Sequence, residues 1–402
     1  MVLKTSVNEL ALFGGQPAFG EVLHVGRPNI GSRDRLLERI NDMLDRRWLS
    51  NNGVFVQELE TKLAVFLGVK HCIAMCNATV ALEITARALG LSGEVIVPSF
   101  TFVATAHALQ WQEITPVFCD VDPLTHNIDP AKVENLITPR TTGILGVHVW
   151  GCACDIEALG AIADKHHLKL MFDAAHAFAC THNGQKIGSF GDAEVFSFHA
   201  TKFFNSFEGG AITTNNDDLA EKIRSMRNFG FAGLDNVISV GTNGKMSEVS
   251  AAMGLTSLES LNDFIETNYN NYLAYFKGLN GIFGLRLVKF NEKEENNYQY
   301  IVIEVDEHVT GISRDLLVKI LHKENIRARR YFFPGCHQME PYLSYFPNAG
   351  LVLPETEKLT LRVLQLPTGT AVREADINKI CDLIRFVFAN QQEIHDQRKF
   401  LE

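Results

Sequence analysis

The stretch Ser197-Phe198-His199-Ala200-Thr201-Lys202, which runs on to Phe207-Glu208-Gly209-Gly210, places one lysine just after an apolar run. That run, Ala193 to Phe198, predicts a buried β-strand, and a second strand-like run, Ala211 to Thr214, follows the Gly-Gly turn. Burial beside apolar walls lowers the pKa of a lysine, so its amine becomes a nucleophile that can form a Schiff base with a carbonyl. A lone loop lysine is more often a solvated surface residue, so this interpretation depends on the rest of the chain.

Apolar runs and helix-like stretches alternate from about Cys72 to Asn228. Runs with little polar alternation, joined through helices, are typical of a mostly parallel sheet covered on both faces. The pattern therefore predicts α/β architecture, in which ligands bind beyond the carboxyl ends of the strands. The predicted strands are Cys72–Met75, Glu94–Val97, Ile114–Cys119, Gly143–Val149, Lys169–Phe172, Glu194–Phe198 and Ala211–Thr214, and the predicted helices are Thr79–Leu89, Ala104–Trp111, Ala131–Leu136, Ile156–His166 and Asp218–Arg227.

The character of the sequence changes at about Asn262. Beyond it, the pattern predicts a helix around Asn268–Tyr275, a strand over Tyr298–Val305, and helices over Ser313–Glu324 and Ala371–Ala389. This mixture is typical of a smaller α+β domain. We therefore expect a large domain over residues 1–261 and a small C-terminal domain over residues 262–402.

Composition excludes some classes of partner. The formal net charge of −10 argues against a nucleic-acid or anionic-membrane surface, because either needs a basic field. No stretch approaches the roughly 20 apolar residues of a membrane span, and Met1 to Leu12 lacks a signal-peptide pattern. The eight cysteines form no CxxC pair, so we expect buried thiols rather than a metal site, in a reduced, cytoplasmic protein.

An acidic residue, Asp173, follows the predicted strand Lys169–Phe172 and so lies at the carboxyl edge of the sheet. A carboxylate there can pair with a protonated pyridine nitrogen, a hydrogen bond worth about 1.5–3 kcal/mol. The small side chain of Ala175 leaves room for a flat ring, and His176 can reach a ring hydroxyl. A helix N-cap role for Asp173 and a packed core role for His176 remain open alternatives.

Other strand ends carry residues suited to a phosphate and a ring. Ala78 and Thr79 open a predicted helix, whose free N–H groups and dipole bind phosphate, and Ser197 can donate to the same group. Phe102 can stack on a ring, although a core phenylalanine is the commoner case. Together with Asp173 and Lys202, these residues occupy successive strand ends in a specific order along the chain. Pyridoxal phosphate has a ring, a phosphate and a carbonyl group with which such a lysine can form a Schiff base.

On these residues the chain resembles the sugar aminotransferases of the DegT/DnrJ/EryC1/StrS type. That family has the fold-type I architecture of transferases that depend on pyridoxal phosphate, and the resemblance implies a seven-stranded central sheet. The resemblance to this family extends from Leu12-Phe13-Gly14-Gly15 to the last helices. It implies that Lys202 is the Schiff-base lysine and Asp173 the partner of the pyridine nitrogen. The implied cofactor-binding residues are Ala78, Thr79, Phe102, Asp173, Ala175, His176, Ser197, Lys202 and Asn243.

The family's Asn-Tyr-Arg-Met-Ser/Thr-Glu/Asp element corresponds here to residues 243–248, Asn-Gly-Lys-Met-Ser-Glu. By resemblance, Asn243 would reach the cofactor phosphate of a neighbouring subunit, which implies a homodimer with shared active sites. Lys245 would hold a donor carboxylate or a sugar-nucleotide phosphate, with a solvated surface lysine as the alternative. Arg330, Tyr331 and His337 are candidate substrate contacts, and a purely structural role stays open for each.

Three stretches narrow the resemblance to one branch: residues 199–202, residues 207–210 and the run from Arg330 to His337. They resemble enzymes that transfer the amino group of L-glutamate to the C4 ketone of dTDP-4-keto-6-deoxy-D-glucose. The products would be dTDP-4-amino-4,6-dideoxy-D-glucose and 2-oxoglutarate, with pyridoxamine phosphate formed between the half-reactions. The alternatives are a 3-aminotransferase, an enzyme for a UDP- or GDP-linked sugar, and a non-catalytic regulator on the same fold. Downstream use, as in O-antigen synthesis, stays open.

Overall fold

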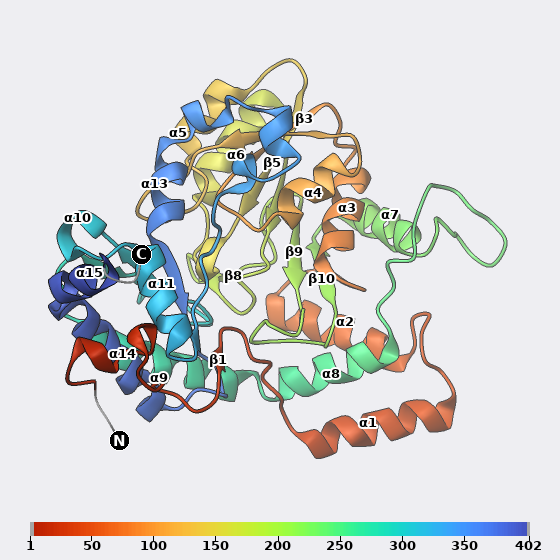
Figure 1. Ribbon diagram of the computed structural model, residues 1–402. Helices are drawn as coiled ribbons and strands as arrows, with labels where there is room; N and C mark the ends of the chain where they lie inside the picture. The colour runs from red at the N-terminus through yellow and green to blue at the C-terminus, as the bar shows by residue number, and fades with distance from the viewer. Residues whose placement is uncertain (1–3, 400–402) are drawn as a thin grey trace.

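Seven strands form the central sheet of the computed structural model, which describes residues 4–399 (Figure 1). The strand order is β2-β10-β9-β6-β5-β3-β4, and only β10 runs against its neighbours. The mostly parallel α/β sheet predicted from the sequence is therefore confirmed. Its strands are β2 (His71–Met75), β3 (Glu94–Pro98), β4 (Thr115–Cys119), β5 (Thr141–Val147), β6 (Lys169–Asp173), β9 (Ala193–Ser197) and β10 (Gly210–Thr214).

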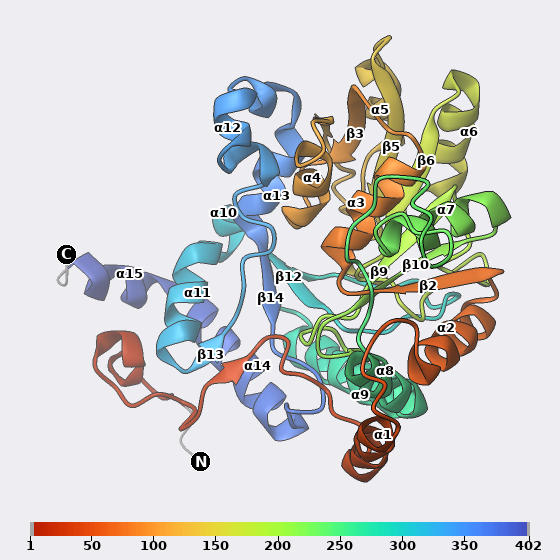
Figure 2. The same cartoon turned by 90° about the vertical axis from the view of Figure 1, so that its right-hand side faces the viewer.

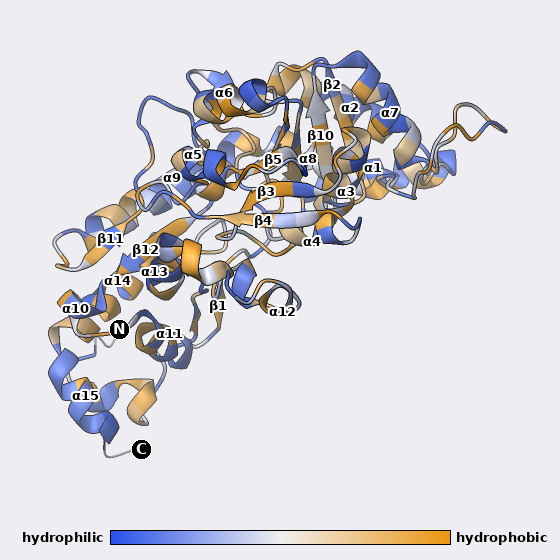
Figure 3. Ribbon diagram, turned by 90° about the horizontal axis from the view of Figure 1, so that it is seen from above, coloured by the Kyte–Doolittle hydropathy of each residue, from blue (hydrophilic) through white to orange (hydrophobic). Residues whose placement is uncertain are grey.

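Helices cover both faces of this sheet, because successive side chains of a strand point to opposite faces. Ile73 and Val195 pack with α3, α4 and α7, whereas Cys72 and Phe196 pack with α2, α6 and α8. Figure 3 shows the apolar strand β3 enclosed among the helices. The helices of this part are α1 (Arg33–Arg46), α2 (Val54–Leu67), α3 (Ala78–Ala88), α4 (Ala104–Gln110), α5 (Pro130–Val133), α6 (Ile156–His166), α7 (Asp217–Arg227) and α8 (Glu248–Glu259), and a short hairpin joins β7 (Thr181–His182) to β8 (Gln185–Lys186).

A second, three-stranded antiparallel sheet lies in the C-terminal part, in the order β11-β12-β14 (Figure 2). Its strands are β11 (Leu285–Leu287), β12 (Ile301–Val305) and β14 (Val363–Leu366). The predicted strand Tyr298–Val305 thus begins three residues late, at Ile301. The helices here are α9 (Leu261–Leu279), α10 (Glu307–Thr310), α11 (Arg314–Lys323), α12 (Tyr342–Tyr345), α13 (Pro354–Arg362), α14 (Glu374–Ala389) and α15 (Gln391–Lys399).

The N-terminal segment packs on this C-terminal part. Its strand β1 (Leu23–His24) pairs in parallel with β13 (Ile326–Arg327), and Val7, Leu10 and Phe19 belong to the core cluster of the C-terminal part. The division into domains of residues 1–261 and 262–402 stays a prediction. All eight cysteines are free thiols, and six of them are buried, as expected for small apolar side chains. Among residues 4–399, no helix is long and apolar enough to cross a membrane.

The buried carboxylate of Glu248, at the start of α8, joins this helix to α2 on the same face of the large sheet. Its oxygens accept hydrogen bonds from Phe55 N (2.9 Å) and Val56 N (3.0 Å), two of the free N–H groups in the first turn of α2. The N-cap residue of α2, Gly53, has no side chain to do this, and a Cβ there would lie 2.5 Å from the Glu248 carboxyl carbon. Glu248 therefore supplies the cap that the local sequence lacks.

We expect Glu248→Ala to lower the free energy of unfolding by about 2–3 kcal/mol, because two buried N–H groups lose a charged acceptor. Urea denaturation measures the change. Glu58→Ala on the same helix is the matched control, since Glu58 is exposed and pairs with Lys62 at i,i+4; it should change the value by no more than about 0.5 kcal/mol. Equal effects of the two substitutions would contradict the capping role.

Candidate active site

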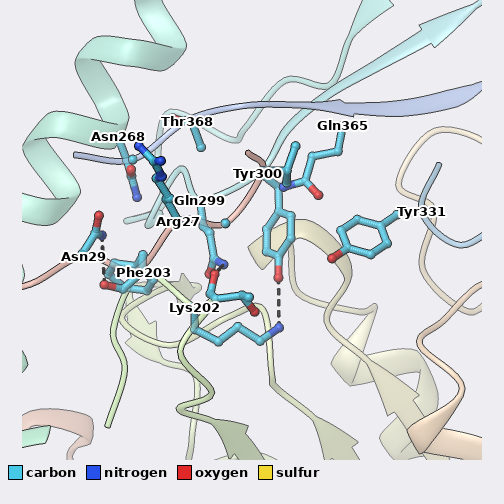
Figure 4. A pocket seen from close by; sticks show the side chains of 14 residues that line it. Arg27, Asn29, Lys202, Phe203, Asn268, Gln299, Tyr300, Tyr331, Gln365 and Thr368 are labelled. Carbon is cyan, nitrogen blue, oxygen red and sulfur yellow. Dashed lines mark hydrogen bonds between the residues drawn. The ribbon is translucent and has the colours of Figure 1, made fainter. Parts of the chain in front are cut away.

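Lys202 lies on a loop that closes immediately after β9. Phe198 N–H donates to Gly209 O (2.9 Å), Ser206 N–H donates to Phe198 O (2.9 Å), and Lys202 N–H donates to His199 O (2.8 Å). These bonds hold the lysine at the carboxyl edge of the sheet. Its Nζ donates to the Tyr300 hydroxyl at 3.0 Å (Figure 4). Burial lowers the pKa of Lys202 to about 8, and the nearby Asp173 carboxylate partly opposes this shift.

Asp173 is the last residue of β6 and only 6% exposed. One carboxylate oxygen accepts a hydrogen bond from Ala175 N (3.0 Å) and the other from the Thr105 hydroxyl (2.9 Å). Burial raises the pKa of Asp173, opposed by those two hydrogen bonds and by the charge of Lys202. No helix begins after Asp173, so the N-cap alternative is wrong.

The imidazole of His176 is buried and has one defined acceptor atom. Trp150 N–H donates to His176 Nδ1 at 3.3 Å, so the neutral ring carries its proton on Nε2. Burial holds the pKa of His176 well below its usual value, with a further contribution from the charge of Lys202. The ring stacks on Trp150 and Phe332 and lies 4.1 Å from the Tyr300 ring. His176 is therefore a fixed, neutral hydrogen-bond donor through Nε2.

The N-terminus of α3 lies at the same edge of the sheet. Asn77 caps the helix by accepting a hydrogen bond from Val80 N at 2.8 Å, and the N–H groups of Ala78 and Thr79 are in its first turn. A Cβ on Gly210 would lie 2.9 Å from Ala78 N, so only glycine leaves this helix terminus accessible. The arrangement is suited to an anion.

These residues share one cavity of about 300 Å³. Phe102 is 57% exposed, so its ring is not part of the core, unlike the commoner case considered for it. The cavity brings together nine of the residues predicted from the sequence: Ala78, Thr79, Phe102, Asp173, Ala175, His176, Ser197, Lys202 and Tyr331.

Two of the predicted substrate contacts lie elsewhere. The Arg330 side chain donates to Asp315 at 3.1 Å and lies over the Phe333 ring, outside the residues that line the cavity. His337 is 1% exposed; its Nδ1 bonds to the Ser99 hydroxyl (2.7 Å) and its Nε2 to Glu357 (2.8 Å). These contacts favour a purely structural role for Arg330 and His337, which was the alternative to substrate binding.

The residue that lines the cavity in place of Arg330 is its neighbour, Arg329, whose guanidinium lies over the Tyr331 ring at 4.7 Å. Sequence reasoning also missed Thr105, Tyr300 and Phe332. The Arg329-Arg330 pair was a visible signal, but the sequence could not show which arginine faces the cavity. Thr105 and Tyr300 have no distinctive local pattern.

Asn243 and Lys245 follow a loop, residues 229–242, that projects away from the body of the protein in Figures 1 and 3; we call this loop the arm. Asn243 is exposed, and Lys245 Nζ donates to Asn228 Oδ1 at 3.0 Å. Neither residue lines the cavity of its own subunit. Their expected contacts with the cofactor phosphate and the substrate stay predictions.

We expect the reaction of Lys202 with cyanate to rise with pH and reach half its maximum near the pKa of about 8. Asp173→Asn should move this midpoint downward, because the carboxylate is the group that raises the Lys202 pKa. Mass spectrometry of the carbamylated peptides between about pH 6 and 10 measures both, with the exposed Lys62 peptide as reference. A midpoint that moves upward in Asp173→Asn would refute the electrostatic coupling.

Comparison with known proteins identifies the family. The model of the DegT/DnrJ/EryC1/StrS aminotransferase family matches residues 32–385. A dTDP-4-amino-4,6-dideoxy-D-glucose transaminase of Shigella dysenteriae is 39% identical over 90% of this chain and 98% of the relative, and a GDP-perosamine synthase of Caulobacter vibrioides is 34% identical over 89% and 96%. The crystal structure of DesI in the presence of its TDP-sugar product has 47% identity and a TM-score of 0.93, covering 98% of this chain and 100% of DesI. The predicted fold is thus confirmed, and the chain belongs to the DegT/DnrJ/EryC1/StrS aminotransferase family.

Proposed function

We propose that this protein is a nucleotide-sugar aminotransferase that depends on pyridoxal phosphate. It transfers the amino group of L-glutamate to the C4 ketone of dTDP-4-keto-6-deoxy-D-glucose. The observation that carries the proposal is that Lys202 and the buried Asp173 carboxylate line the same cavity, and that the pKa of Lys202 is lowered. The names of two relatives at 36% and 39% identity, both dTDP-4-amino-4,6-dideoxy-D-glucose transaminases, support this choice of sugar and nucleotide.

The cavity fits pyridoxal phosphate on several independent points. Asp173 is a buried carboxylate whose two recorded side-chain hydrogen bonds come from neutral donors, so a protonated pyridine nitrogen would complete its environment. The α3 terminus, left open by Gly210, would take the phosphate together with Thr79 and Ser197. His176 Nε2–H would donate to the ring hydroxyl, and Phe102 and Ala175 would lie against the two ring faces.

When bound, the cofactor supplies an electron sink that stabilises negative charge at the carbon losing its proton. The chain's own residues supply the proton transfers. Lys202, as the neutral amine, accepts the α-proton of glutamate and later returns a proton to C4 of the sugar. A pKa of about 8 suits both roles near neutral pH, because the amine gains and loses its proton with little free-energy cost. Asp173 would stay ionised beside the cationic pyridine nitrogen and would hold the proton on that nitrogen.

Substrate selection falls to the rim of the cavity. Arg329 provides a guanidinium and Tyr331 an aromatic hydroxyl on the side of the C-terminal part. A guanidinium pairs well with a carboxylate or a diphosphate, and both proposed substrates carry such a group.

We further propose that the reaction takes place in the cytoplasm, where a reducing environment would keep the eight thiols free.

The direct test is to incubate the purified protein with dTDP-4-keto-6-deoxy-D-glucose and L-glutamate and to determine the product by NMR. We expect an amine at C4 and release of 2-oxoglutarate. An amine at C3, or turnover only with GDP- or UDP-linked keto-sugars, would replace the proposed substrate by one of the alternatives. Failure of every amino acid tried to bleach the yellow protein would overturn the aminotransferase proposal itself.

Lys202→Ala should reduce turnover by at least about 10²–10⁴-fold, the usual contribution of a positioned acid–base group. Lys62→Ala, on the exposed surface of α2, is the control and should leave turnover unchanged. Retained turnover in Lys202→Ala would remove the lysine from the mechanism.

We also propose that the protein works as a homodimer whose subunits complete each other's active sites. The arm exposes Leu234 (93%) and Val240 (72%), together with Val237 and Ile238, far more apolar surface than a free loop of this length needs. Asn243 and Lys245, at the base of the arm, do not reach the cavity of their own subunit. A second copy covering the arm would bury these side chains and bring Asn243 to the partner's phosphate site.

Mixed dimers test this arrangement. Lys202→Ala and Asn243→Ala should each be inactive or strongly impaired alone, since each removes part of every site. After unfolding and refolding together in equal amounts, they should recover about a quarter of wild-type activity, because half of the dimers are mixed and each holds one complete site. If Asn243 acts within its own subunit, no mixed dimer has a complete site and activity does not return.

A further inference from the structure

A second, smaller pocket adjoins the cavity and shares Thr201, Lys202 and Tyr331 with it (Figure 4). Its volume is about 40 Å³. Three parts of the chain line it: the N-terminal segment through Arg27, the lysine loop through Lys202, and the C-terminal part through Asn268, Tyr300 and Gln365. The pocket therefore reaches from the reactive amine toward the surface, where Arg27 is exposed.

Two residues that line this pocket have a buried amide oxygen with no hydrogen-bond donor among residues 4–399: Asn268 Oδ1 and Gln365 Oε1. Their residues are only 1% and 3% exposed. The Asn268 amide nitrogen donates to Asn297 O at 2.9 Å, which fixes the orientation of that amide. An unsatisfied buried acceptor costs about 1–3 kcal/mol, so each oxygen calls for a donor from outside the chain.

The pocket is so small that the donor to these oxygens must be water. A water molecule needs about 10–15 Å³ of such space, so the pocket holds two or three waters but neither an amino acid nor a sugar. In Figure 4, Gln365 lies on the Tyr331 side of Tyr300, whereas Asn268 lies beside Arg27. The two acceptors thus mark separate positions on opposite sides of Tyr300, and the one on Asn268 is beside the exposed Arg27.

Tyr300 connects the pocket to the chemistry. Its oxygen accepts the hydrogen bond from Lys202 Nζ, so its own O–H is free to donate in another direction. Within the described part of the chain, no acceptor for this O–H is recorded, and Tyr300 lines the pocket. Burial raises the pKa of Tyr300 well above its usual value, so the hydroxyl keeps its proton and can pass one on only while receiving another.

We propose that Tyr300 and two or three waters held by Gln365 and Asn268 form a path along which Lys202 exchanges protons with solvent. This proposal rests on the proposed function, in which Lys202 takes the α-proton of the amino donor. The Lys202 ammonium gives a proton to the Tyr300 oxygen while Tyr300 gives its own to the first water, and the row of waters passes one to solvent at the mouth. The reverse sequence restores the ammonium, so no electrons are transferred.

The first experiment measures hydrogen exchange against amino transfer. The holoenzyme is incubated in D₂O with ¹⁵N-labelled L-glutamate and unlabelled 2-oxoglutarate; NMR gives deuterium gained at Cα, and mass spectrometry gives ¹⁵N transferred. In the wild type, most transfers should bring deuterium to Cα. In Tyr300→Phe and Gln365→Met, the ratio of deuterium gained to ¹⁵N transferred should fall about threefold or more over many transfers, because an amine that does not exchange with solvent comes to carry mainly the hydrogens that it has taken from Cα. An unchanged ratio overturns the path, whereas absence of ¹⁵N transfer in the wild type overturns the proposed function instead.

The second experiment needs no activity. In a high-resolution crystal structure of the cofactor-free protein, ordered waters should lie within hydrogen-bond distance of Gln365 Oε1 and Asn268 Oδ1; a dry pocket overturns the proposal. Gln365→Met should lower the melting temperature of the cofactor-free protein by roughly 1–3 °C, because the bound water loses a partner. Gln185→Met, an exposed glutamine on β8, is the matched control and should not change it. An unchanged or higher melting temperature in Gln365→Met would show that its oxygen held no water.

Discussion

Lys202 and Asp173 are an amine and a carboxylate that are buried together at the carboxyl edge of the sheet. Burial destabilises both charges, and hydrogen bonds from Thr105 and Ala175 to Asp173 and from Lys202 to Tyr300 offset this cost. Burial pushes the two pKa values toward neutrality, the lysine downward and the aspartate upward, while each charge pulls the other back. Because both pKa values are shifted toward neutrality, the two groups can exchange protons near neutral pH and can bind a charged ligand. A pair fully solvated at the surface would lack both properties.

Trp150 links this edge of the large sheet to the C-terminal part. Its backbone has φ +62°, a left-handed conformation that is uncommon for a large side chain and that turns its N–H toward His176 Nδ1. Its indole N–H donates to His126, which in turn bonds to Glu304 on β12. The tautomer of His176 is thus fixed through contacts that cross between the two sheets. The strain at Trp150 is offset by a buried, fully bonded indole stacked on Phe332.

Local patterns were sufficient where a residue directly follows a buried strand. Asp173, Ser197 and Lys202 come at strand ends, and the carboxyl ends of parallel strands meet at one edge, so their convergence follows from the strand assignment. Arg330 and His337, which the sequence offered as substrate contacts, do not line the cavity, and the sequence could not show this for the opposite reason. Their segment, between β13 and α13, has no long regular element, so no periodicity indicates which side chains face the cavity.

The sequence by itself determined the alternation of strands and helices, and with it the edge where Lys202 and Asp173 meet, because apolar periodicity encodes which face of each element is buried. Only the tertiary structure decided that Arg329 rather than Arg330 lines the cavity, that Tyr300 holds the lysine amine, and that two amide oxygens are left without donors beside it. These features depend on contacts between segments about 100 residues or more apart, such as Lys202 with Tyr300, and no local pattern records such contacts. They are fixed by how the C-terminal part and the N-terminal segment pack on the edge of the large sheet.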